Sequence, residues 1–255
     1  MSTGELAPRP GAAPAVRMVG AHARFELVQL LRNSEQLLLT VIIPTVLLVL
    51  FTKVGVVDLG PGSRVDFLLP GILMLAVLST AFTAQAIGTG FERRYGVLKR
   101  LGATPLPRAG LLAGKTAAVL AIEAGQVVLL VAVGAALGWR PHGSNVPAAA
   151  VLVVLGTVTF AGLALLMAGT LRAEATLAAA NLVYLLLLLA GGIVVPLDKF
   201  PAGARTVLQW LPSTALADGL RAALAGVAIP GRVWAALLIW AAVSVAAAAR
   251  WFRWE

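Results

Sequence analysis

A Gly-Lys-Thr triplet at residues 114–116 is the stretch that most directly suggests chemistry, because the same triplet ends the phosphate-binding loop of nucleotide-hydrolysing proteins. That loop has the pattern G-x-x-x-x-G-K-[ST] and follows a buried strand, so that backbone N–H groups converge on the phosphates. Here Ala109 occupies the position of the first glycine, and Pro105 and Pro107 precede it, which a core strand does not tolerate. The triplet therefore does not predict an ATP site. We interpret Lys115 as a residue at the polar end of an apolar helix, and on that basis we expect Lys115→Ala to have a mild effect.

Other residues that carry chemistry are sparse. Cysteine is absent, which excludes disulfides and thiol catalysis. The two histidines, His22 and His142, lie far apart in the sequence, so no metal site is predicted. Glu123 and Gln126 lie about one helical turn apart inside an apolar segment and are candidates for a substrate pathway. Two interpretations of Glu123 stay open: contact with a cationic substrate, or a hydrogen bond to Gln126 or to a neighbouring helix.

The composition indicates an all-α integral membrane protein. The chain is 60% hydrophobic and only 12% charged, whereas about a quarter of the residues of a soluble domain are charged. About 20 apolar helical residues cross the hydrocarbon core. A continuous apolar run in lipid forms a helix, because its backbone N–H and C=O groups must be hydrogen bonded within the segment. We expect six transmembrane helices, at about 37–57, 67–91, 111–137, 147–171, 175–195 and 233–249.

A seventh apolar stretch, residues 207–229, is interrupted by Pro212 and carries Asp218 and Arg221 beyond that break. Two charges at mid-bilayer are costly, so we do not interpret this stretch as a span. We expect a re-entrant hairpin of two short half-helices in the outer leaflet.

The positions of Lys and Arg predict the orientation. With the N-terminus in the cytoplasm, thirteen of the 20 Lys and Arg residues fall inside, which satisfies the positive-inside rule and places both termini in the cytoplasm. The net charge of +9 is then a topology signal rather than a sign of nucleic-acid binding. Residues 1–16 are rich in Ala, Pro and Gly without a hydrophobic run, which predicts a disordered cytosolic tail and no secretory signal.

Residues 17–36 are expected to form an amphipathic helix before the first span. Met18, Ala21, Phe25 and Val28 follow helical spacing, and Arg24 lies off that stripe. A basic amphipathic helix in this position lies in the plane of the membrane interface. A cytosolic helix packed on the rest of the protein is an equal alternative.

The loop after the second span is the most informative stretch. Within residues 91–110, Phe91, Tyr95 and Leu98 fall on one helical face, and Gly102 followed by Thr104-Pro105 ends the helix. The pattern predicts a short amphipathic helix in the cytoplasm between two spans. It is either a helix lying at the interface or a handle that another protein binds.

Residues 69–115 resemble the permease subunits of type-2 ATP-binding cassette (ABC) exporters. The resemblance rests on a Leu-Pro-Gly start to the second span, an acidic-basic-Gly-x-Leu cytosolic helix, a Leu-x-x-x-Pro with a following Arg, and a Gly-Lys at the third span. The matching residues are Pro70, Gly71, Glu92, Arg93, Gly96, Leu98, Leu101, Pro105, Arg108, Gly114 and Lys115. Residues 191–226 resemble the outer re-entrant hairpin of the same family, with Pro196, Pro201, Pro212, Asp218 and Arg221 at matching places. The chain also resembles, more loosely, the drug-resistance branch.

The resemblance implies that ATP binding and membrane transport belong to different chains. A separate cassette ATPase subunit, in two copies, would bind ATP and Mg, and this chain would bind no cofactor. It would pair with a second permease chain, identical or homologous, in the cell membrane. The coupling helix that contacts the ATPase would comprise Phe91, Glu92, Arg93, Arg94, Tyr95, Gly96, Leu98, Arg100 and Leu101.

The very apolar spans favour an amphipathic or hydrophobic substrate, drug-like or lipid-like. Two other classes of protein fit the sequence less well. An ion-coupled secondary transporter is the alternative, although the chain shows no repeated half with broken helices. A membrane-embedded enzyme would need clustered polar residues at one depth, which the spans do not offer.

Overall fold

The computed structural model describes residues 13–54, 63–141, 143–192 and 200–253. Within these ranges all regular structure is helical, which confirms the predicted all-α class. The helices are α1 (Ala15–Arg32), α2 (Ser34–Lys53), α3 (Arg64–Val77), the π-helix η2 (Leu78–Ala84), α4 (Gln85–Arg94), α5 (Val97–Gly102), α6 (Arg108–Ala136), α7 (Val146–Thr170), α8 (Ala173–Ala190), α9 (Ala202–Leu208), α10 (Pro212–Leu224) and α11 (Gly231–Trp251).

Five helical stretches in the described part of the chain are long and apolar enough to cross a membrane: Arg64–Arg94, Ala109–Ala136, Val146–Thr170, Ala173–Ala190 and Gly231–Trp251. They correspond to the second to sixth predicted spans. The helix α2 corresponds to the first, and within it the shorter stretch Thr40–Lys53 is apolar.

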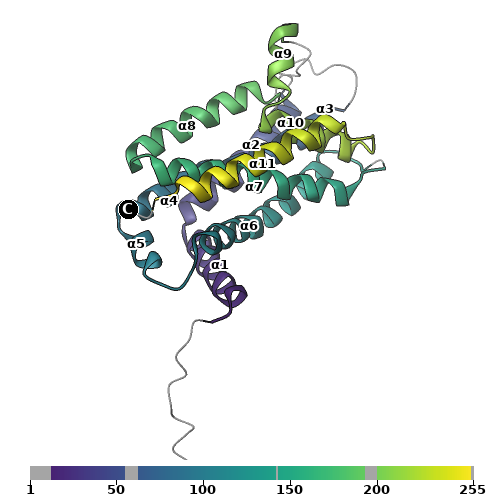
Figure 1. Cartoon of the computed structure of the whole chain (residues 1–255). Coiled ribbons are helices and arrows are strands. Elements are labelled where there is room, and N and C mark those ends of the chain that lie inside the picture. The colour runs from purple at the N-terminus through teal and green to yellow at the C-terminus, as the bar shows by residue number, and fades with distance from the viewer. Residues whose placement is uncertain (1–12, 55–62, 142, 193–199, 254–255) are drawn as a thin grey trace, which may run out of the picture.

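The spans pack into one bundle. Figure 1 shows α6, α7, α8 and α11 running side by side, with α1 and α5 at one end of the bundle and α9 at the other. The helix α7 packs against α11, α4, α10 and η2. Its small residues allow the close approach to α11: a Cβ atom added to Gly162 would lie 2.5 Å from the Ser244 Oγ. Small residues at helix contacts are how transmembrane helices gain packing energy without a hydrophobic driving force.

The second span is one helical rod whose middle turn-and-a-half is a π-helix. The segment η2 lies between α3 and α4 without a break in the chain's helical path. A π-helix is hydrogen bonded between residues i and i+5 rather than i and i+4, and it is found frequently at functional sites. Here it carries Ser79, Thr80 and Thr83, so hydroxyl groups line the middle of an otherwise apolar span.

The N-terminal helix α1 agrees with the predicted position, but a different face is packed. It lies against α6, and its buried residues are His22 and Glu26. The predicted apolar stripe is partly exposed, at Phe25 and Val28. The reason is a charged partner on α6, described below. Residues 1–12 of the predicted disordered tail lie outside the described residues.

Candidate functional site

The predicted coupling helix is two helices joined by a left-handed glycine. The helix α4 ends at Arg94, Gly96 has a φ of 72°, and α5 starts at Val97. A residue with a side chain is strained at this φ, which explains the glycine. The segment from Phe91 to Gly102, here called the coupling segment, therefore turns sharply where the sequence pattern predicted one continuous helix.

The turn sends two side chains of the predicted common face in different directions. Tyr95 is 68% exposed and its ring stacks on Phe91 at 6.2 Å between centroids. Leu98 is fully buried in a cluster with Leu111 and Phe252. Leu98 therefore anchors α5 to the bundle, and Tyr95 is available to a partner.

Two arginines hold the coupling segment to the turn between α7 and α8. The Arg93 Nη2 donates a hydrogen bond of 2.6 Å to the Leu171 carbonyl oxygen, and Arg94 forms an ion pair with Glu174. Both partners of that ion pair are about half exposed, so it contributes little to stability and mainly orients the segment. We call this end of the bundle, which carries Arg93, Arg94, Lys99, Arg100 and Arg172, the basic end.

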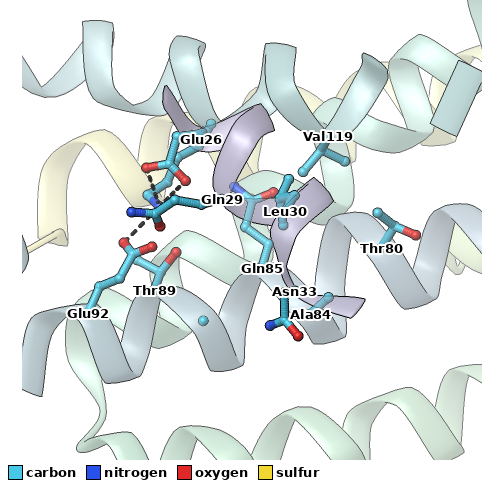
Figure 2. Close-up of a pocket in the computed structure, with 12 residues that line it drawn as sticks. Glu26, Gln29, Leu30, Asn33, Thr80, Ala84, Gln85, Thr89, Glu92 and Val119 are labelled. Atoms are coloured by element: carbon cyan, nitrogen blue, oxygen red, sulfur yellow. Dashed lines mark hydrogen bonds and ion pairs between the residues drawn. The ribbon is translucent and has the colours of Figure 1, made fainter. Parts of the chain in front are cut away.

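A buried charge cluster connects the coupling segment to α1 and α6. The Lys115 Nζ lies 2.7 Å from the Glu92 Oε2, and 2.8 Å and 2.9 Å from the two carboxylate oxygens of Glu26 (Figure 2). The Lys115 side chain is 4% exposed. A buried ammonium in this position needs its partners, because an unpaired charge in the interior is very costly. Lys115 therefore has a structural role, and we now expect Lys115→Ala to be destabilising rather than mild.

His22 extends the same cluster on α1. Its Nε2 lies 3.4 Å from the Glu26 Oε1, one turn along the helix. Burial lowers the pKa of the His22 imidazole below its usual value, and the positive charge of Lys115 lowers it further, while Glu92 opposes the shift. His22 is therefore neutral at pH 7.

An acidic cavity of about 180 Å3 opens beside this cluster, between α1, α4 and α6. Figure 2 shows its lining side chains, which include Glu26, Gln85 and Glu92. Next to it runs a lateral groove of about 540 Å3, lined from α2, η2, α4 and α8. Its lining mixes apolar side chains such as Ile43 and Phe91 with polar ones such as Tyr184.

The candidates Glu123 and Gln126 are both buried and hydrogen bonded between helices. The Thr157 hydroxyl of α7 donates to a Glu123 carboxylate oxygen. Gln126 accepts from the Thr80 Oγ1 at 3.1 Å and donates to the Thr40 carbonyl oxygen at 3.0 Å. The other Glu123 carboxylate oxygen has no hydrogen-bond partner among the described residues, and both interpretations of Glu123 stay predictions.

The stretch predicted as the outer hairpin contains α9 and α10, separated at residues 209–211. Pro201 precedes α9 and Pro212 is the first residue of α10, where its missing N–H costs nothing. Asp218 lies 2.8 Å from Arg232 and 3.3 Å from Arg221, whose guanidinium stacks 4.1 Å from the centre of the Phe67 ring. The charges that argued against a span are thus paired with one another and with the aromatic ring. Pro196 lies outside the described residues.

No group of three or more His, Asp or Glu residues within the described ranges is placed to hold a metal ion.

Comparison with known proteins identifies the family. Residues 19–225 match the model of the ABC-2 type transporter family, so the chain belongs to that family, whose members are permease subunits of ABC transporters. The chain is also 24% identical over 204 residues to the protein named "Putative transport permease YvfS" of Bacillus subtilis (strain 168), an alignment that covers 76% of this chain and 80% of that protein. The resemblance to permease subunits of type-2 ABC transporters is confirmed.

Sequence reasoning missed several residues that the fold brings to the coupling segment. These residues are Glu26, Glu174 and Gln85, and the sequence analysis assigns no role to any of them. One signal was present: Lys115 stands at the start of an apolar helix, where a buried cation requires an acidic partner. The sequence does not say which acid supplies it.

Proposed function

We propose that this chain is the membrane-spanning permease subunit of an ATP-driven exporter, which moves an amphipathic or hydrophobic substrate outward with energy from a separate cassette ATPase subunit. ATP and Mg belong to that partner. The observation that carries the proposal is the coupling segment, whose base is tied to three parts of the bundle through Glu92, Arg94 and Leu98. A segment held in this way transmits a displacement to the spans instead of bending.

The exposed surface of the coupling segment supports docking of the ATPase subunit. Tyr95 and Arg100 are exposed at the basic end, and aromatic and arginine side chains are enriched where protein interfaces bind most tightly. A push on α5 would reach α6 and α11 through the cluster around Leu98, and would reach α8 through Arg94 and Glu174.

The absence of an ATP site in this chain is supported by the position of Lys115. A phosphate-binding lysine must be free to contact phosphate oxygens, whereas this ammonium is buried between two carboxylates. The triplet at residues 114–116 lies inside the first turns of α6, where the backbone N–H groups are hydrogen bonded within the helix.

The lateral groove is the proposed path of the substrate. It lies on the side of the bundle formed by α2, η2, α4 and α8 and combines apolar walls with hydroxyl and amide groups from Ser79, Thr83 and Asn181. A second permease chain facing this side would close the groove into a central pathway. We assign Glu123 and Gln126 to holding the helices together rather than to this path, because both bond to adjacent helices.

The orientation proposed is the one that the positive-inside rule favours, with the basic end and both termini in the cytoplasm of a plasma-membrane protein. Six spans are proposed, with α2 as the first. In this orientation α1 lies at the inner membrane surface, with its exposed Phe25, Val28 and Leu31 in the interface.

Co-purification tests the proposal. The permease is co-expressed with a cassette ATPase encoded beside it, and the pair is isolated through a tag on the permease. We expect Tyr95→Ala together with Arg100→Glu to remove the ATPase without changing the amount of inserted permease. Arg140→Glu, a charge reversal after the far end of α6, is the matched control. Purified permease that hydrolyses ATP without a partner would overturn the assignment.

A further inference from the structure

The acidic cavity and the lateral groove lie next to each other. Asn33, Ala84 and Gly88 line both. This adjacency suits a molecule with one end among the charges of the cavity and the other among the apolar walls of the groove.

The cavity is acidic in composition. The ionisable side chains that line it are Glu26, Glu92 and Lys115, so two carboxyl groups stand against one ammonium. The Lys115 ammonium already contacts both carboxyl groups. His22 lies beside the cluster, and burial lowers its pKa. The excess of carboxyl groups favours a cation and disfavours an anion in the cavity.

A second, independent observation indicates a ligand. Gln85 is 8% exposed, and neither its Nε2 nor its Oε1 finds a hydrogen-bond partner among the residues that the structure describes. Figure 2 shows this side chain reaching from α4 toward α1, into the cavity. Buried polar groups are nearly always hydrogen bonded, because an unsatisfied one costs about 1–3 kcal/mol. The amide is therefore placed to bind something that enters the cavity.

The groove supplies the complementary surface. Ile43, Ile87 and Phe91 give it an apolar wall suited to a hydrocarbon or aromatic body. Ligand sites combine such walls with a few convergent polar groups that fix orientation. The charged groups line the adjoining acidic cavity, whereas the polar side chains of the groove itself, such as Ser79, Thr83 and Asn181, are neutral.

We propose that the substrate is an amphiphile with a cationic head, which lies in the acidic cavity beside Glu92 and Gln85 while the apolar body lies in the lateral groove. The inference rests on the proposed export function and names its substrate class. It also links substrate binding to the coupling segment, because the head contacts the same Glu92 carboxylate that Lys115 contacts. Binding then changes the ion pair between Glu92 and Lys115 at the base of the coupling segment, and this change is transmitted to the ATPase.

The test uses the purified permease alone and three probes that differ only in the head: octylamine, octanol and octanoate. Octylamine is protonated at pH 7, as a lysine side chain is. Affinity is measured by titration calorimetry in one detergent, so that partition into micelles is common to all variants. For the wild type we expect octylamine to bind about tenfold more tightly than octanol, the size of one charge-assisted hydrogen bond, and octanoate to bind most weakly.

Two substitutions in the cavity and one outside it locate the site. Glu92→Gln removes the charge, and Gln85→Met removes the amide at similar volume and keeps every charge. Glu92→Gln should abolish or strongly reduce the preference for octylamine over octanol, and Gln85→Met should weaken the binding of octylamine. Glu123→Gln, the same change in a buried carboxylate outside the cavity, should keep the preference. If Glu92→Gln does not fold, Gln85→Met decides.

The inference is wrong if the three probes bind equally, or if Glu92→Gln keeps the preference and Gln85→Met keeps the wild-type affinity for octylamine. Loss of the preference in Glu123→Gln alone would also overturn it and would move the cation site to α6 and α7. Because no ATPase subunit takes part, these outcomes are separate from the co-purification test. A permease that binds its ATPase but has no preference for octylamine would be an exporter of another substrate class.

Discussion

The Lys115 ammonium lies 2.7 Å from the Glu92 carboxylate, and this contact joins the first turns of α6 to the base of the coupling segment. Glu26 completes the cluster from α1, so three segments that are far apart in the sequence meet at one buried charge. Lys115 therefore has a structural role, although it belongs to a Gly-Lys-Thr triplet that matches the end of a nucleotide-binding motif. It also lies beside the cavity in which we place the head of the substrate.

Removing the cation should be strongly destabilising. Lys115→Met leaves two buried carboxylates without their partner, and breaking a buried pair in this way costs about 3–5 kcal/mol. We expect a large fall in the thermal unfolding midpoint of the purified permease. Thr116→Ala, at the next position of the triplet, should be nearly neutral.

A compensating variant checks the cause of that loss. Combining Lys115→Met with Glu26→Gln and Glu92→Gln removes both orphaned charges and should recover much of the stability, because neutral replacements of a buried ion cluster are often tolerated. A triple variant as unstable as Lys115→Met would show that packing, rather than charge, is responsible.

Stability should depend on pH through His22. Its folded-state pKa is lowered by burial and by Lys115, so the unfolded chain binds the proton more readily. The contribution of neutral His22 is complete above the unfolded pKa of about 6.5 and is lost as the pH falls toward the folded pKa. Unfolding midpoints measured from pH 8 to pH 5 should therefore fall on the acidic side. The fall should be smaller in His22→Gln and unchanged in His142→Gln, the control at the second histidine of the chain.

The turn between α4 and α5 should require glycine. Gly96→Ala meets no atom within 4 Å, so the cost comes from the left-handed φ alone, about 1–2 kcal/mol. We expect a lower unfolding midpoint and a lower ratio of transport to ATP hydrolysis. Gly125→Ala is the matched control, because its Cβ also meets nothing within 4 Å but its backbone is ordinary helix. Equal midpoints for the two variants would contradict the argument.

Single cysteines should report the proposed topology, since the chain has none of its own. Cysteines at Gly143, between α6 and α7, and at Gly203, in α9, should react with a membrane-impermeant maleimide added to intact cells. A cysteine at Gly4 should react only after the membrane is opened. Labelling of Gly203 from the cytoplasmic side alone would overturn the orientation of the outer hairpin.

The transmembrane segments were predictable because they are local. An apolar run of about 20 residues makes a membrane helix wherever it occurs, so the limits of α6, α7 and α11 agree with the predicted spans to within a few residues. Pro212 likewise marks the start of α10 by its own covalent geometry. The family could also be recognised, because its short motifs follow one another in order along the chain.

The tertiary structure alone decided which charges meet. Glu26 and Lys115 are 89 positions apart in the sequence, and only the packing of α1 on α6 brings them within hydrogen-bond distance. The helical spacing of Tyr95 and Leu98 predicted a common face. The left-handed Gly96 between them changes the direction of the chain, so Tyr95 is exposed and Leu98 is buried. The local pattern specifies where a helix lies and how hydrophobic it is. The partner of each buried polar group depends on three-dimensional packing, because a charge in the interior is stable only where another segment supplies its counter-charge.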